Sequence, residues 1–336
     1  MVFIQVILGG ITRLTDSGLS ITEWELIKGV IPPLTEADWQ IAFDKYQNHA
    51  KQQYEALHAD MTMSSFKWIY FWEWIHRMWA RMMGFVFLIP LTFFAAKKWI
   101  DRPLAIQLVT MFSLAALEGL FGWIMVASGL NNDQRTWVSA YKLMIHLGIA
   151  SALFGYIYWT ICSLNRNSRE IIMDNRCYKW ACWIAVLFFI QILLGGLMAG
   201  MRAALLYPYY PAILHLDLFK SGLGGHVGLS EVINYERSIV MKTYIQLIHR
   251  GLALVLLILS IYIHRKVRHH VQIRRYFIWV MGGILTQYLL GILTIVYSRG
   301  GVPVNLGVIH QAVALLVFLL VLRFLYNMKY RAAKIG

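Results

Sequence analysis

Charged residues are scarce in this chain, and acidic residues are the scarcer kind. Lys, Arg, Asp and Glu together make up 14% of the 336 residues, and the mean hydropathy is +0.56. A soluble domain carries about 25% charged residues, so the composition excludes one and predicts an all-α integral membrane protein within a lipid bilayer. The net charge of +14 lies mostly in short segments between apolar runs, as orientation signals do, so no nucleic-acid partner is expected.

Cysteine is nearly absent as well. Cys162, Cys177 and Cys182 fall at or beside one predicted cytoplasmic loop, and they lack the spacing of a metal finger. Disulfides are disfavoured in the cytoplasm. The three residues are therefore interpreted as packing residues.

Long apolar runs dominate the rest of the sequence. Runs long enough to span a bilayer occupy residues 69–96, 104–128, 140–163, 180–200, 243–263, 276–297 and 306–326. A further run, Met1–Ile11, is too short for a full span, so the first of eight expected helices is either short or lacks its beginning. It has no basic n-region and no small-residue cleavage site, which argues against a signal peptide.

Basic residues gather in every second connection between the predicted helices, and these connections lie on the same side. Three connections are rich in them: Lys97, Lys98 and Arg102; Arg166, Arg169, Arg176 and Lys179; and Arg265, Lys266, Arg268, Arg274 and Arg275. Because positive loops stay inside, we expect a bacterial plasma (inner) membrane protein with both termini in the cytoplasm. The short loops on the opposite side carry only Arg135 and Arg299, and the long outer loop 13–67 has mixed charge.

The sequence repeats itself. Gln5–Gly10 returns as Gln191–Gly196, Glu73–Arg77 as Gln246–Arg250, and Glu118–Gly122 as Gln287–Gly291. Two units that run in the same direction predict a parallel duplication, namely two tandem four-helix bundles related by a pseudo-two-fold axis along the membrane normal. The expected parts are an N-terminal half at 1–165, a cytoplasmic linker at 166–179 and a C-terminal half at 180–336.

Four histidines lie at matching depth in this scheme. His76, His146, His249 and His310 each sit about two turns inside the outer end of a different even-numbered helix. Two neutral imidazoles on facing helices can ligate both axial positions of a haem iron, which pairs His76 with His146 and His249 with His310. The alternative is that they are hydrogen-bonded core residues or line a proton path, but four at one depth favour haem.

Basic side chains accompany these histidines. Arg77 and Arg250 follow them directly, Arg81 lies one turn further, and Lys142 precedes His146 by one turn. They are candidates to pair with haem propionates. The competing interpretation is that Lys142 snorkels to the interface and that the arginines pair with helix carboxylates.

Carboxyl groups distinguish the two halves. Glu73 is replaced by Gln246 in the second half, and Glu118 by Gln287. Glu73 shares a helix face with His76, and a carboxyl at low dielectric could accept a proton, so chemistry is predicted at the first site and electron transfer at the second. The alternative for Glu73 is a structural hydrogen bond or an ion pair with Arg77 or Arg81, and the role of Glu118 stays open.

Several segments together resemble one family. They are Gly9–Ser20 (Gly-Gly-Ile-Thr-Arg-Leu-Thr-Asp-Ser-Gly-Leu-Ser), Pro32–Pro33, Glu73–Arg77 and Val138–His146. Over nearly its whole length the chain resembles the haem A synthases, membrane enzymes that oxidise the C8 methyl of haem O to a formyl group by successive hydroxylation. The resemblance implies a substrate site of Glu73, His76 and His146, and a haem b cofactor on His249 and His310.

The resemblance also implies partners. These are haem O synthase, an electron-transfer partner and cytochrome oxidase assembly factors, and a homo-oligomer is compatible with the sequence. The chain departs from the family at Tyr207–Pro211, which leaves the contacts of the outer segment 201–242 open, and its outer loops lack the cysteine pair of one branch, which excludes a regulatory disulfide there. Two other functions remain in view: a non-enzymatic dihaem b electron-transfer cytochrome and a transporter.

Overall fold

The protein is helical throughout the part that the structure describes. This computed structural model describes residues 1–24, 28–130, 135–164, 175–211, 220, 222–269 and 271–329. Within them, seven helices are long and apolar enough to cross a membrane, and a shorter apolar helix opens the chain. The predicted all-α membrane protein with seven to eight apolar helices is confirmed, and each predicted run falls on one of these helices.

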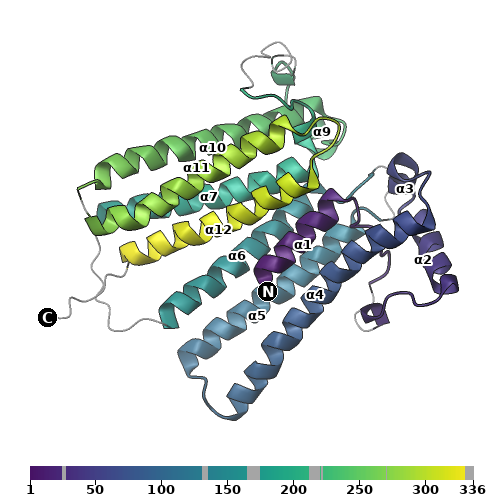
Figure 1. Cartoon of the computed structure of the whole chain (residues 1–336), viewed down its shortest axis with the longest axis horizontal. Coiled ribbons are helices and arrows are strands. Elements are labelled where there is room, and N and C mark those ends of the chain that lie inside the picture. The colour runs from purple at the N-terminus through teal and green to yellow at the C-terminus, as the bar shows by residue number, and fades with distance from the viewer. Residues whose placement is uncertain are drawn as a thin grey trace. The chain divides into compact units, whose positions relative to one another are not determined.

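The helices follow one another with short connections, apart from two outer segments. In chain order the elements are α1 (Val2–Leu14), η1 (Lys28–Val30), α2 (Glu36–His49), α3 (Lys51–Leu57), α4 (Met63–Ala96), α5 (Arg102–Ala127), α6 (Ala140–Leu164), α7 (Asn175–Gly200), η2 (Ala203–Leu205), α9 (Leu229–Ile233), α10 (Ile239–Val267), α11 (Val271–Val296) and α12 (Val304–Lys329). Figure 1 shows the order by colour.

The chain forms two compact units, Met1–Ala150 and Ser151–Gly336. The division falls within α6, whereas the sequence places it at the linker 166–179. Most of that linker, including Arg166 and Arg169, lies outside the described residues, as do His215 and His270. The three cysteines are free thiols, two of them buried, as expected for packing residues.

The second unit contains a closed ring of four helices. α10 packs on α7 and α11, and α12 packs on α11 and α7 (Figure 1). Their shared core is aromatic and aliphatic: the Phe188 and Phe318 rings stack with centroids 6.4 Å apart, and Phe277 meets Phe324 at 5.0 Å. The outer faces stay apolar, with Trp279 68% exposed, which suits contact with lipid acyl chains.

In the first unit, α4 connects the membrane-spanning part to the outer segment. It packs along α1 and continues outwards to meet α2 (Figure 1). Its 34 residues extend about 51 Å, more than the ~30 Å hydrocarbon thickness of a bilayer. The Thr62 hydroxyl caps its first turn by accepting from Ser65 N at 3.2 Å.

An aromatic core holds the outer segment on the first turns of α4. Phe66 is fully buried there, its ring 4.9 Å from that of Phe43 and stacked at 5.5 Å on that of Tyr46. Burial raises the pKa of the Tyr46 hydroxyl above its ordinary value, and this hydroxyl contacts His58 Nδ1 at 2.5 Å. The helices α2 and α3 thus fold as a small cap on α4.

The N-terminus of α2 is fixed by a reciprocal capping box. The Thr35 hydroxyl accepts from Asp38 N at 3.1 Å, and Asp38 Oδ2 accepts from Thr35 N at 3.1 Å. The hydrogen bonds from the Thr35 hydroxyl and amide lower the pKa of Asp38. The cap begins at this turn because two of the first backbone N–H groups find side-chain partners.

Replacing Phe66 by Ala should loosen this cap. The change removes a fully buried ring, and such truncations cost about 3–5 kcal/mol. We expect faster limited proteolysis within residues 36–57 of the detergent-purified protein. The matched control is Ile41→Ala in α2, whose side chain is 54% exposed; equal cleavage rates in both variants and the unmodified protein would contradict the packing described.

Candidate functional site

The four predicted histidines come together in two pairs, one in each unit. His76 on α4 interacts electrostatically with His146 on α6, and His249 on α10 interacts in the same way with His310 on α12. All four side chains are partly buried. Each unit therefore contains one of the two pairs, and the shared ligation of a haem iron by each pair stays a prediction.

Each imidazole lies against a glycine of the preceding membrane helix. A Cβ atom added at Gly9 would lie 3.1 Å from the imidazole of His76, and one added at Gly122 would lie 3.0 Å from that of His146. In the second unit, the distances are 3.6 Å from Gly195 to His249 and 3.2 Å from Gly291 to His310. Three of these distances are tighter than ordinary contact. A side chain at Gly9, Gly122 or Gly291 would require the ring to shift, so these three glycines limit where the imidazole can lie, whereas the contact at Gly195 is an ordinary one.

One turn before each glycine, a glutamine or glutamate supports the same histidine. In the second unit, Gln191 Nε2 donates to the carbonyl oxygen of His249 at 3.0 Å, and Gln287 Nε2 donates to that of His310 at 3.0 Å. Each of these amide nitrogens also lies 3.2 Å from the Nδ1 atom of the same histidine. In each case one side-chain amide therefore contacts both the backbone carbonyl and the imidazole ring of the histidine.

The first unit has the same supports with one change. Gln5 Nε2 donates to the carbonyl oxygen of His76 at 3.2 Å, as its counterpart in the second unit does. Beside His146 the residue is Glu118, whose Oε1 lies 3.0 Å from Nδ1. One [Gln/Glu]-x-x-x-Gly pattern therefore includes Gln5, Glu118, Gln191 and Gln287, on α1, α5, α7 and α11. The sequence analysis did not identify this common pattern, although its spacing is visible in the sequence.

The arginine after each of two histidines clamps the outer segment of its own unit. Arg77 Nη2 donates to the carbonyl of Ile21 at 2.8 Å, and Nη1 donates to that of Glu23 at 3.0 Å. Arg250 repeats this arrangement with the carbonyls of Tyr207 at 2.7 Å and Tyr209 at 3.1 Å. The duplication therefore extends into outer segments whose sequences differ.

A turn in the left-handed region precedes each clamped segment at the same spacing. Asp16 has φ 54° and Arg202 has φ 49°, and each is a non-glycine residue at the end of the first helix of its unit. Such a conformation is uncommon for these residue types. The same conformation therefore occurs at equivalent positions of the two halves, five residues before the first carbonyl that the arginine binds.

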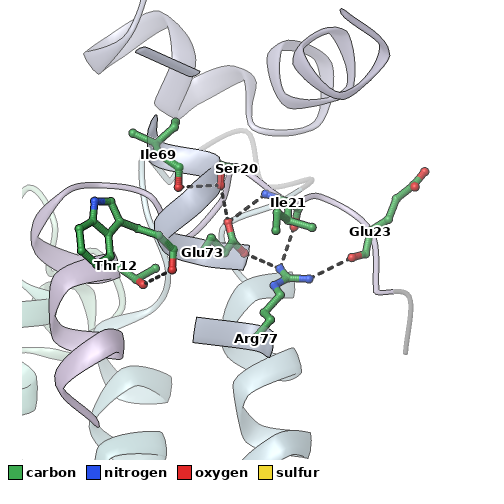
Figure 2. A network of polar contacts seen from close by, with 8 residues as sticks. Thr12, Ser20, Ile21, Glu23, Ile69, Glu73 and Arg77 are labelled. Atoms are coloured by element: carbon green, nitrogen blue, oxygen red, sulfur yellow. Dashed lines mark hydrogen bonds and ion pairs between the residues drawn. The ribbon is translucent and has the colours of Figure 1, made fainter. Parts of the chain in front are cut away.

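Glu73 is buried and fully engaged (Figure 2). Its Oε2 accepts from the Ser20 hydroxyl at 2.8 Å and from Ile21 N at 2.9 Å, and its Oε1 lies 2.5 Å from Arg77 Nη2. The ion pair with Arg77, which the sequence offers as the alternative to acid–base chemistry, is present. Glu73 thereby fixes the arginine that clamps the outer segment.

The counterpart of Glu73 makes a single contact. Gln246 is also buried, and its Nε2 donates to the carbonyl of Ala203 at 2.7 Å. An amide can anchor the outer segment without a charge, whereas the carboxylate of Glu73 also balances its arginine. The first site therefore carries a buried ion pair at the place where the second carries a neutral hydrogen bond.

The remaining predicted basic residues lie nearby on the same helices. Lys142 Nζ donates to the carbonyl of Ile124 at 3.3 Å, which ties α6 to α5. Arg81 is partly buried, one turn beyond Arg77 on α4. With the guanidinium groups of Arg77 and Arg250 bound to backbone carbonyls, pairing of these residues with haem propionates stays a prediction.

The donor set fits a haem iron better than a bare metal ion. Each unit offers two imidazoles, and the described residues contain no group of three or more His, Cys, Asp or Glu that could hold a metal ion. A porphyrin supplies four nitrogens itself and needs only two axial ligands. The glycines beside His76, His146 and His310 approach these imidazoles closely, which restricts the orientation of the rings.

Comparisons with known proteins identify the family of the chain. The family model described as cytochrome oxidase assembly protein, COX15-CtaA, matches residues 1–322. Three relatives are each named haem A synthase. The one from Flavobacterium johnsoniae is 35% identical, and the match covers 94% of this chain and 90% of the relative. The one from Parvibaculum lavamentivorans is 37% identical over 95% of this chain and 88% of the relative, and the one from Bartonella henselae is 39% identical over 93% of this chain and 85% of the relative. The chain therefore belongs to the COX15-CtaA family of cytochrome oxidase assembly proteins.

Proposed function

We propose that this protein is an oxidoreductase that makes haem A from haem O in haem A biosynthesis for terminal oxidases. It oxidises the C8 methyl group of haem O to a formyl group by successive hydroxylation. The observation that carries the proposal is the match to the family along residues 1–322, together with relatives named haem A synthase. The conversion is an oxidation, so electrons leave the substrate for an acceptor, and an electron-transfer partner belongs to the proposal.

The two halves of the chain have different roles in this proposal. The N-terminal half, residues 1–165, holds the substrate haem, and the C-terminal half, 180–336, holds haem b, with 166–179 as the cytoplasmic linker. The halves form tandem four-helix bundles related by a pseudo-two-fold axis along the membrane normal. The repeated histidine supports and the repeated arginine clamps support this arrangement.

In the second half, His249 and His310 are the residues that would hold the iron of haem b. Gln191 and Gln287 hold these histidines by ring and backbone, so the ligands need little rearrangement to bind iron. When bound, haem b supplies a one-electron relay. The closed ring of α7, α10, α11 and α12 suits a cofactor that stays in place, and Arg250 could meet a propionate at the outer end.

In the first half, His76 and His146 are the proposed ligands of the haem O iron, and Glu73 is the proposed proton acceptor. Glu73 lies three residues before His76 on α4, so both side chains project from one helix face. A carboxyl group in this place could take up a proton during the reaction, and its contacts with Arg77 and Ser20 hold it in position. Arg77, Arg81 and Lys142 complete the proposed set as partners of the propionates.

The proposed setting is the bacterial plasma (inner) membrane, with both termini in the cytoplasm and the histidine sites near the outer face. The basic connections between the apolar helices support this orientation. Haem O synthase would deliver the substrate, and cytochrome oxidase assembly factors would receive the product. The description of the family as cytochrome oxidase assembly proteins supports the last of these partners.

A dihaem b electron-transfer cytochrome is the second candidate, because all four histidines have closely similar supports. Expression in cells that make haem O distinguishes the two. We expect the extracted pigments to contain haem A, identified by mass and by its pyridine haemochrome spectrum. Haem b alone, with no hydroxylated or formylated product even when an electron-transfer partner is supplied, would overturn the enzyme and favour the cytochrome.

Substituting Glu73 by Gln should lower haem A formation while haem b stays bound. Loss of a general base costs about 10²–10⁴-fold in rate. The hydrogen bonds described for Glu73 join it to Ser20, Ile21 and Arg77, all in the first half. The measurement is product per bound haem b in membranes from matched cultures. Unchanged product in this variant would remove Glu73 from the mechanism.

A second variant separates proton transfer from positioning. Ser20→Ala removes one hydrogen bond to Glu73 Oε2 and leaves the carboxylate and its ion pair in place. If Glu73 accepts a proton, Ser20→Ala should keep most of the product that Glu73→Gln loses. An equal loss in both variants would assign Glu73 to anchoring the outer segment instead.

A further inference from the structure

The two halves differ at the residue that follows one histidine support on its helix. In the second half this residue is Tyr288, directly after Gln287 on α11. The internal repeat places Gly119, directly after Glu118 on α5, at the equivalent position. One half therefore has a large aromatic side chain where the other has no side chain.

Tyr288 reaches the outer segment that Arg250 clamps. The hydroxyl groups of Tyr288 and Tyr210 form a hydrogen bond, and the two rings meet edge to face with their centroids 6.3 Å apart. Tyr210 follows Tyr209, whose carbonyl accepts from Arg250, and it also interacts electrostatically with Arg250. The tyrosine pair therefore joins α11 to the outer segment that is held on α10.

The first half keeps only the outer member of this pair. The residue equivalent to Tyr210 is Trp24, which follows Glu23 of the other clamp, and the Arg77 guanidinium carbon lies 5.8 Å from the centre of its ring. Gly119 is exposed, and a Cβ atom added there would meet no neighbouring atom of the described residues within 4 Å. The aromatic residue on the outer segment thus has no partner at the equivalent position of α5.

The packing of the helices differs in the same sense. α10 packs along α11 in the second unit, whereas α4 and α5 make no comparable contact among the residues that the structure describes. Ile284, one turn before Tyr288, is buried, but the equivalent Ala115 is exposed. The first site is therefore less enclosed between α4 and α5 than the second is between α10 and α11.

We infer that Tyr288 and Tyr210 form a latch that retains the haem of the second half, and that Gly119 leaves the first half without one, so that its haem enters and leaves between α4 and α5. The inference rests on the proposed function in one respect, that each half binds one haem between its two histidines. A flat ring as large as haem can pass between membrane helices only where two of them separate. The latch opposes this separation because it ties α11 to a segment held on α10.

This difference agrees with the tasks proposed for the two halves. A cofactor stays bound through many turnovers, whereas a substrate has to be replaced in each one. A ring pair and a hydrogen bond across the exit slow the release of the first and would also slow the exchange of the second. Tyr288 therefore suits a cofactor site, and Gly119 suits a substrate site.

The first test measures how fast the second half of the full-length protein releases haem b to an excess of apomyoglobin. The protein carries His146→Ala, so that only the second half holds haem. Tyr288→Gly should speed release about tenfold, because a ring pair and a hydrogen bond are lost, and Tyr288→Phe, which loses only the hydrogen bond, should have a smaller effect.

Leu289→Gly is the matched control for this test. It places the same helix-weakening residue at the next position of α11, where the side chain is 51% exposed. We expect its release rate to equal that of the parent protein. Release from Tyr288→Gly as slow as from Leu289→Gly would overturn the inference.

The reciprocal test adds a ring to the first half. Full-length protein that carries His310→Ala is loaded with added haem b, and Gly119→Tyr should slow its release to apomyoglobin about tenfold, since the new ring can meet Trp24 as Tyr288 meets Tyr210. Leu120→Tyr adds the same ring at the next position, which is 47% exposed, and should leave the rate unchanged. Equal release rates in these two variants would contradict the inference.

Both tests read a release rate of haem b and need no conversion of haem O. Altered rates in a protein that forms no haem A would support the latch and contradict the proposed enzyme. Unaltered rates in a protein that forms haem A would contradict the latch and leave the enzyme supported. The failure of one proposal is therefore distinguishable from the failure of the other.

Discussion

A polar side chain inside a bilayer must find its partners within its own protein, and this constraint shapes both histidine pairs. Water is not available at that depth, and an unsatisfied polar group there costs several kcal/mol. The chain meets part of this requirement with one pattern used four times, in which a glutamine or glutamate lies beside the histidine and a glycine one turn later makes room for its ring. One side-chain oxygen of each glutamine or glutamate stays buried without a hydrogen-bond partner in the described part of the chain. Each odd-numbered membrane helix thereby fixes a ligand on the helix that follows.

The two arginine clamps connect the histidine-bearing helices to the segments 13–67 and 201–242. Arg77 follows His76 directly and Arg250 follows His249, so the helix turn that presents a ligand also holds the outer segment. Both clamps bind backbone carbonyls, which every residue type provides. That explains how Ile21–Glu23 and Tyr207–Tyr209 can differ in sequence and still be held in the same way. Glu73 adds a buried charge to the first clamp, where the second has a neutral amide.

The sequence predicted the apolar helices, because the length of an apolar run is a property of the chain itself. The pairing of the histidines around haem, which the internal repeat indicates, stays a prediction. It did not predict the partners of Glu73. Helical spacing places Glu73 on the face of His76, but the contacts with Ser20 and Ile21 depend on an outer segment more than fifty residues away. The supports were present in the sequence as two separate repeats, and only the contacts showed that Gln5 and Glu118 play the same part.

The central claim is that each half holds one haem between its own two histidines and that the two haems differ. The most direct measurement is the identity of the haems extracted from purified His146→Ala and His310→Ala proteins, made in cells that supply haem O. The account predicts that His146→Ala loses haem O and its oxidised products and keeps haem b, while His310→Ala loses haem b. Loss of the same haem from both variants, or of both haems from each, would contradict it.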